Sequence, residues 1–116
     1  MITLYGIPNC DTVKKARTWL DANGHAYTFH DFKKAGLDEA TVAGWLQQQS
    51  WETLVNKKGT TWRGLPDAQK AAVTDASSAA ALMLQHTSVI KRPVLRAGNT
   101  ILVGFDAALY EKTLNA

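Results

Sequence analysis

The chain has 116 residues, 46% of them hydrophobic, and it contains a single cysteine. This length fits one domain, and the apolar share is large enough for a core, which excludes wholesale disorder. The formal net charge of +3 is smaller than expected of a dedicated nucleic-acid binder but suits an anionic small ligand, and the lone cysteine excludes an intramolecular disulfide and any cysteine-rich metal site.

The sequence contains no targeting or membrane signal. No stretch approaches the ~18 consecutive apolar residues of a transmembrane helix, and the first residues lack the basic and apolar regions of a secretory signal. An unpaired cysteine is typical of a reducing compartment. We therefore expect a cytoplasmic protein with no membrane and no nucleic-acid partner. The sequence does not determine the oligomeric state, and we expect a monomer. The three histidines are too far apart in the sequence to predict a metal site.

Residues 1–30 predict a strand–helix–strand unit. A short strand over residues 2–5 is followed by a helical pattern that opens at Cys10 and stops before Gly24, where glycine adopts the left-handed backbone without penalty. Residues 26–30 alternate like a second strand. Two strands joined by a crossover helix are expected to be parallel.

The middle of the chain predicts helices. Residues 37–88 carry apolar side chains at helical spacing, with Asp38 and either Thr74 or Asp75 as N-terminal caps. Trp62 lies in a polar loop, and we expect it to cover these helices rather than to line a ligand groove.

The last part of the chain predicts a hairpin and a helix. Two β-rich runs flank Gly98-Asn99, which is typical of a tight turn, and Asp106 can cap the final helix. The order is βαβ, then helices, then ββα. We therefore predict an α/β fold in a single domain over residues 1–116, with residues 37–88 as a helical insertion. The sequence is also compatible with residues 37–88 forming a small subdomain of their own.

Cys10 lies where a strand passes into a helix. The first N–H groups of a helix have no intrahelical partner, and the helix end carries a partial positive charge, so both favour thiolate over thiol. Lys14, one turn further on, adds positive charge. The thiolate is the nucleophile in thiol–disulfide exchange. A buried, inert cysteine is the alternative reading of the same residue.

The chain offers no second thiol to Cys10. A Cys-x-x-Cys motif would place one at position 13, where this chain has Val13. Any catalytic cycle must therefore use an external thiol, and glutathione is the abundant cytosolic candidate.

Arg92 and Pro93 precede the hairpin. A proline at the start of a strand could hold a cis peptide bond, although the trans form is far more common. Arg92 offers a planar fork of donors for a carboxylate or an oxyanion, or is a solvated surface charge.

Residues 5–16, which read YGIPNCDTVKKA, resemble the active-site segment of the arsenate reductase (ArsC) superfamily, and most closely its Spx/YffB-like branch. The resemblance continues over residues 28–33, 54–63, 90–95 and 103–106. It implies a thioredoxin-like fold with a helical insertion. It also implies a nucleophilic Cys10 beside a cis-Pro93, and an oxyanion-binding role for Arg92.

The chain departs from the arsenate reductases at several positions. Gly6 replaces a histidine, Asn56 replaces an arginine, and no arginine follows the last strand. These changes weaken arsenate reduction, which needs several donors around a dense oxyanion. Val13 argues against the dithiol redox switch that Spx regulators usually carry. The resemblance therefore fits best the YffB-like branch, whose members are suspected glutathione-dependent thiol reductases.

The predicted function is a glutathione-dependent thiol reductase acting on a small-molecule or disulfide substrate, with glutathione as cosubstrate and no metal. Cys10 is the predicted catalytic residue. The predicted binding residues are Asn9, Lys14, Lys57, Lys58, Lys91, Arg92 and Pro93. Two alternatives remain: a glutathione-linked arsenate reductase, and a non-catalytic Spx-like adaptor that binds a protein partner such as RNA polymerase.

Overall fold

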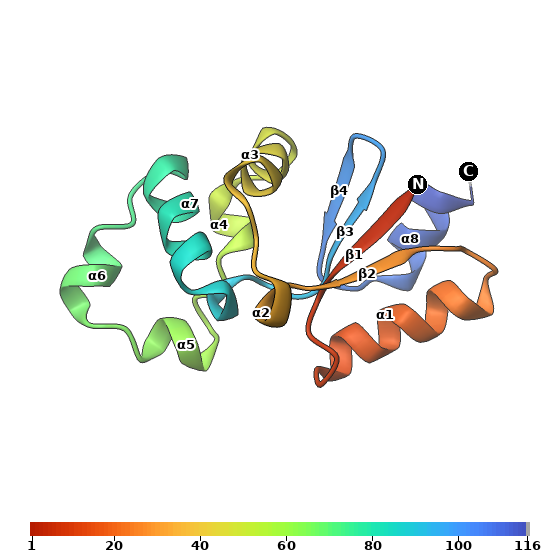
Figure 1. Ribbon diagram of the computed structural model, residues 1–116, viewed down its shortest axis with the longest axis horizontal. Helices are drawn as coiled ribbons and strands as arrows, with labels where there is room; N and C mark the ends of the chain where they lie inside the picture. Colours follow the sequence, from red (N-terminus) through yellow and green to blue (C-terminus); the bar gives the residue numbers. More distant parts are fainter. Residues whose placement is uncertain (116) are drawn as a thin grey trace. The chain divides into compact units, whose positions relative to one another are not determined.

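The computed structural model describes residues 1–115, which divide into two compact units (Figure 1). The first unit comprises Met1–Ala35 together with the chain from Arg92 onward, and the second comprises Gly36–Lys91. Among the described residues, no helix has the length and apolar character needed to cross a membrane.

The first unit is built on a four-stranded sheet in the order β2-β1-β3-β4. The parallel pairing of β1 with β2 and the antiparallel pairing of β3 with β1 and β4 confirm the predicted βαβ and ββα pattern of a thioredoxin-like α/β fold. The strands are β1 Ile2–Gly6, β2 Thr28–Asp31, β3 Val94–Ala97 and β4 Thr100–Val103. The helices of this unit are α1 Asp11–Ala22, α2 Phe32–Ala35 and α8 Ala107–Leu114.

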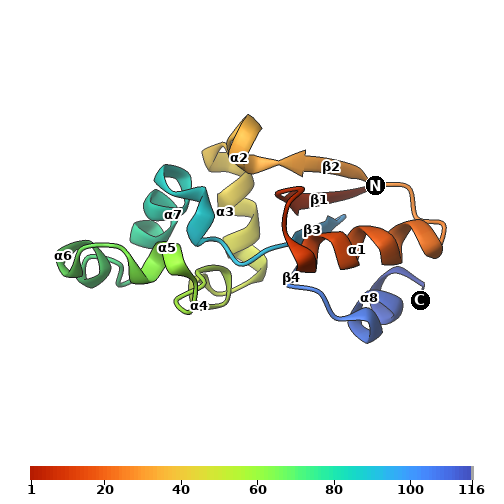
Figure 2. The same ribbon diagram turned by 90° about the horizontal axis from the view of Figure 1, so that it is seen from below.

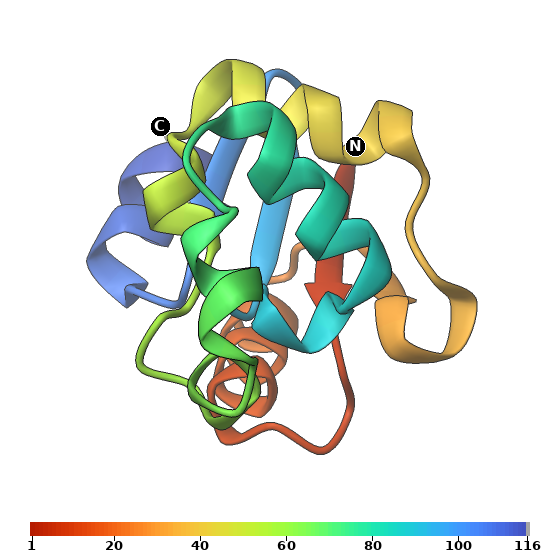
Figure 3. The ribbon, with the colours of Figure 1, turned by 90° about the vertical axis from the view of Figure 1, so that its left-hand side faces the viewer.

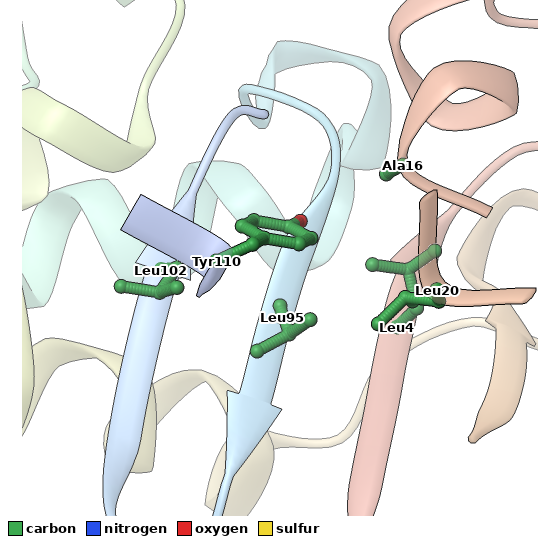
Figure 4. Packing of buried hydrophobic residues seen from close by; sticks show 6 residues of the cluster. All are labelled: Leu4, Ala16, Leu20, Leu95, Leu102 and Tyr110. Atoms are coloured by element: carbon green, nitrogen blue, oxygen red, sulfur yellow. The ribbon is translucent and has the colours of Figure 1, made fainter. Parts of the chain in front are cut away.

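Helices α1 and α8 cover the same face of this sheet (Figure 2). The buried cluster beneath them contains Leu4, Ala16, Leu20, Leu95, Leu102 and Tyr110 (Figure 4). The Tyr110 ring meets Trp19 and Phe105 edge-on, at centroid distances of 5.6 and 4.9 Å. Burial raises the pKa of Tyr110, and its hydroxyl donates to the Gly104 carbonyl at 3.4 Å. Because Ala16 and Leu20 share this cluster with Leu4, helix α1 packs against β1, the strand that precedes it.

The second unit is helical, as predicted for the middle of the chain. Helices α3 and α7 pack against each other (Figure 3), and an isolated bridge joins Val55 to Ile90. Trp62 is 9% exposed and belongs to the buried residues. The helices are α3 Glu39–Gln48, α4 Trp51–Leu54, α5 Thr60–Arg63, α6 Asp67–Ala71 and α7 Ala76–Gln85, followed by the 3-10 turn η1 Thr87–Val89.

Asp75 begins α7 with a capping box. Its carboxylate accepts the Ser78 N–H at 2.9 Å, and the Ser78 hydroxyl oxygen accepts the Asp75 N–H at 3.1 Å. The backbone bond from Ser78, followed by the bond from its hydroxyl, lowers the pKa of Asp75. Of the two candidate caps in the sequence, the helix uses Asp75.

We expect the stabilising effect of the Asp75 charge to depend on pH. Its folded-state pKa lies below the unfolded value of about 3.9, so the effect is complete above roughly pH 5 and is lost as pH falls through the folded value. Asp75→Asn keeps a good cap without the charge. Urea unfolding from pH 7 to 3 should show the advantage of the unmodified chain shrinking at the acid end. A difference that does not change with pH contradicts this account.

Candidate active site around Cys10

Cys10 occupies the N-cap position of α1. Its backbone is extended, with φ −138° and ψ 125°, and its carbonyl accepts the Lys14 N–H at 2.9 Å. The half-buried side chain makes no capping hydrogen bond. The first N–H groups of α1 are therefore available to an anion at Cys10, whether a thiolate or a bound group.

The peptide bond between Arg92 and Pro93 is cis, the form that the resemblance implies. Tyr5 pairs with Val94 across the sheet, so Pro93 lies at the same sheet edge as Gly6 and the loop that leads to Cys10. The Pro93 carbonyl accepts the Gly104 N–H at 2.8 Å, which ties this segment to the end of β4.

Four predicted binding residues belong to the same unit as Cys10. Asn9 is exposed in the loop before it, Lys14 is exposed on α1, and Arg92 is half-buried beside the buried Pro93. Asp11, in the first turn of α1, opposes the positive charge of Lys14. Among the described residues, no group of His, Cys, Asp and Glu side chains could hold a metal ion.

Val13, at the position where a Cys-x-x-Cys motif would hold its second thiol, packs against Gly6. Val13 is fully buried, and a Cβ built on the buried Gly6 would lie 2.8 Å from Val13 Cγ2. The end of β1 thus rests directly on the first turn of α1. From the sequence, Gly6 stands out only as a departure from the arsenate reductases. Its contact with Val13 was not foreseen, because it depends on how the helix packs on the strand.

The other predicted binding residues, Lys57, Lys58 and Lys91, belong to the second unit. The Lys57 ammonium lies 5.1 Å from the ring centroid of Trp51 and 5.6 Å from that of Trp62. Asn56 shapes this loop, because its side-chain oxygen accepts the Lys58 N–H at 3.2 Å. The two tryptophans were not predicted to lie beside a site lysine, because they belong to two separate short helices, α4 and α5, and the turn between these helices brings them together.

We expect Lys57→Gln to destabilise the chain by about 0.5–1 kcal/mol, because it removes an ammonium from two aromatic faces. Lys58→Gln is the matched control, since Lys58 is exposed and makes no such ring contact among the described residues. Chemical denaturation of both variants measures the difference. Equal effects from the two substitutions would mean that the ring contacts contribute nothing.

Curated relatives extend over most of the chain. An uncharacterized protein of Haemophilus influenzae is 39% identical, over 96% of this chain and 96% of its own length. The global transcriptional regulator Spx of Streptococcus agalactiae is 24% identical, over 91% of this chain and 77% of its own length.

Solved structures share both sequence and fold. A protein named YffB is 48% identical with a TM-score of 0.93, over 98% of this chain and 99% of that one. An arsenate reductase (ArsC) related protein from Brucella melitensis is 49% identical with a TM-score of 0.74, over 99% of this chain and 95% of that one. Residues 5–113 match the ArsC family as a whole. With this match, and with relatives that span nearly its whole length, the chain belongs to the ArsC family.

Proposed function

We propose that this chain is a glutathione-dependent thiol reductase in which Cys10 is the nucleophile. The observation that carries the proposal is the position of the chain's only thiol at the N-cap of α1, beside N–H groups that have no partner within the helix. The Cys10 thiolate attacks the glutathione sulfur of a mixed disulfide between glutathione and a substrate thiol. A new disulfide forms between Cys10 and glutathione, and the substrate leaves as its thiolate.

A second thiol must then release Cys10. Position 13 holds a buried valine, so no thiol within the chain can resolve the adduct. A glutathione thiolate attacks the Cys10 adduct, forms oxidised glutathione and returns the Cys10 thiolate. In sum, the substrate disulfide gains two electrons and glutathione supplies them, so the cycle needs no metal.

Glutathione carries carboxylates, and the predicted binding residues are suited to them. Arg92 supplies a planar fork of donors, and Lys14 a positive charge one turn from Cys10. Asn9 supplies a side-chain amide in the loop before Cys10. Pro93 has no N–H, and its carbonyl accepts the Gly104 N–H, so its proposed role is to shape the site rather than to donate to a carboxylate. The binding roles predicted for Lys57, Lys58 and Lys91, which belong to the second unit, remain part of the proposal.

The test is formation of the adduct. The native chain is incubated with oxidised glutathione, and its intact mass is measured before and after addition of reduced glutathione. We expect the mass to rise by one glutathione and then to return to its starting value, with release of oxidised glutathione. A native chain that stays unmodified, while the unfolded chain reacts, contradicts the proposal.

Glutathione-linked arsenate reduction is a second candidate, because a relative 49% identical to this chain is named an arsenate reductase related protein. Gly6 and Asn56 stand where the arsenate reductases carry donors, so the oxyanion would find fewer partners here. Arsenate-dependent oxidation of glutathione measures this activity. Disulfide turnover without arsenate turnover rejects it.

A non-catalytic adaptor is the third candidate, because a regulator named Spx is 24% identical over most of this chain. An adaptor would retain a protein partner such as RNA polymerase when Cys10 is replaced by serine, and it would form no glutathione adduct. Adduct formation by the native chain therefore separates the reductase from this alternative.

A further inference from the structure

The sheet of the first unit has a second face, opposite the one that α1 and α8 cover. Side chains alternate along a strand, and Leu4 and Leu95 lie in the buried cluster, so Thr3 and Arg96 lie on the other face. Thr3 and Arg96 are direct partners across the two central strands, β1 and β3 (Figure 1). Arg96 is exposed and Thr3 is half-buried. Central strands of α/β sheets are usually apolar on both faces, so this polar pair calls for an explanation.

A hollow of about 330 Å³ lies over this pair. Its walls combine polar and apolar groups: Met1 and Tyr5 supply apolar surface, while Thr3 supplies a hydroxyl and Arg96 a guanidinium. Gly98 completes the wall. The volume lies at the lower end of the range for small-molecule sites, which are typically apolar with a few well-placed polar groups.

The Arg96 guanidinium is held in place but is not neutralised. Its Nε donates to the Gly98 carbonyl at 3.2 Å, within a turn where Gly98 takes φ +61°. This bond orients the guanidinium and leaves its other donors for a ligand. Among the described residues, no carboxylate forms an ion pair with Arg96, and β1, β3 and β4 contain no acidic residue. The remaining donors of Arg96 are suited to an anion.

We propose that this hollow binds a small organic carboxylate. The carboxylate takes the guanidinium fork of Arg96 and the hydroxyl of Thr3, and the apolar part of the ligand rests on the Tyr5 ring. A single arginine with an aromatic wall suits a planar monoanion with an apolar body. A free phosphate has a higher charge density and needs more hydrogen-bond donors than this hollow offers.

This site is separate from Cys10. The chain enters β1 at Ile2, beside Ala97 and the turn at Gly98, and leaves it at Gly6 before it reaches Cys10. The hollow therefore lies toward the start of β1, and Cys10 lies beyond its end. Binding here does not depend on the proposed redox function.

The test is a titration of the full chain followed by NMR of the Thr3, Arg96 and Gly98 backbone amides and the Arg96 Nε–H group. Benzoate is the probe, with neutral benzamide and inorganic phosphate as comparisons. We expect saturable shifts at these groups with benzoate and none with benzamide. Loss of a charge-assisted bidentate contact should weaken benzoate binding by about tenfold to a hundredfold in Arg96→Gln. Arg96→Lys should weaken it less.

Arg63→Gln is the matched control, because Arg63 is exposed and belongs to the second unit. It should leave benzoate binding unchanged, and so should Cys10→Ser, which separates failure of this site from failure of the reductase. The proposal is overturned if benzoate gives no saturable shift, if Arg96→Gln and Arg96→Lys bind as tightly as the unmodified chain, or if phosphate binds more tightly than benzoate.

Discussion

Replacing Cys10 by serine is expected to abolish the glutathione adduct and, at the same time, to stabilise the fold. The adduct disappears because the chain has no other thiol. Stability rises because serine is a strongly preferred N-cap whose hydroxyl accepts an N–H of the first helical turn, a bond that the Cys10 side chain does not make. The gain should be up to about 1 kcal/mol. Opposite effects on reactivity and stability are what we expect where a reactive group occupies a capping position.

Two measurements check this prediction. Intact mass after exposure to oxidised glutathione reports the adduct, and thermal unfolding reports stability, where about 1 kcal/mol corresponds to a rise in Tm of roughly 4 °C in a chain of this size. Cys10→Ala is the matched control, since it removes the thiol without supplying a cap. It should also lose the adduct but should show no gain in stability.

The opposite result would be equally informative. If Cys10→Ser were less stable than the unmodified chain, the cysteine side chain would already be making a favourable interaction at the start of α1. If turnover of a glutathione mixed disulfide persisted in Cys10→Ser, the proposed nucleophile would be wrong.

Replacing Gly6 by alanine is expected to destabilise the first unit by about 1–3 kcal/mol, the usual effect of overpacking a core. The added Cβ would lie 2.8 Å from Val13 Cγ2, closer than such carbons approach in folded proteins. Val13 is fully buried and β-branched, so its side chain has little freedom to turn aside. Either the end of β1 or the first turn of α1 must shift, and both lead directly to Cys10.

A double-mutant cycle tests the source of this effect. Val13→Ala removes the carbon that clashes, and alone it is destabilising because it leaves a cavity. If the clash is responsible, Gly6→Ala should cost much less in the Val13→Ala background than in the unmodified chain, as measured by urea unfolding. Additive effects would mean that the contact with Val13 is not the reason why Gly6→Ala destabilises the chain. The rate of adduct formation in Gly6→Ala should fall along with stability.

Much of the local structure could be predicted from short stretches of sequence. Asp38, Asp75 and Asp106 cap helices as expected. Each carboxylate accepts the backbone N–H of the residue three positions later in the chain, at 2.8, 2.9 and 3.2 Å respectively. The turn at Gly98-Asn99 joins β3 to β4 as predicted. Each of these features depends on residues within about one turn of each other, so the information needed to predict it is local.

The neighbourhood of Cys10 was only partly predictable. Its position at the start of a helix follows from the pattern of residues 2–20, whereas the position of Pro93 at the same end of the sheet as Gly6 depends on the β1–β3 register, which joins segments about 90 residues apart. The resemblance to the ArsC superfamily supplied Pro93 as a neighbour, and no local pattern did so. The glutathione-binding role predicted for residues of the second unit remains a proposal. The contacts of Lys57 with Trp51 and Trp62 were not predicted.

By itself, the lone cysteine determined one mechanistic fact: any thiol that resolves an adduct on Cys10 must come from outside the chain. Sequence periodicity and capping determined the order of strands and helices, because backbone preferences and capping bonds act over a few residues. Only the tertiary structure decided how the segments that lead to Cys10 are placed: Val13 packs on Gly6, and Pro93 lies at the same end of the sheet as Gly6. The physical reason is that register and close packing are set by burial across the whole sheet, where residues distant in the sequence compete for the same space.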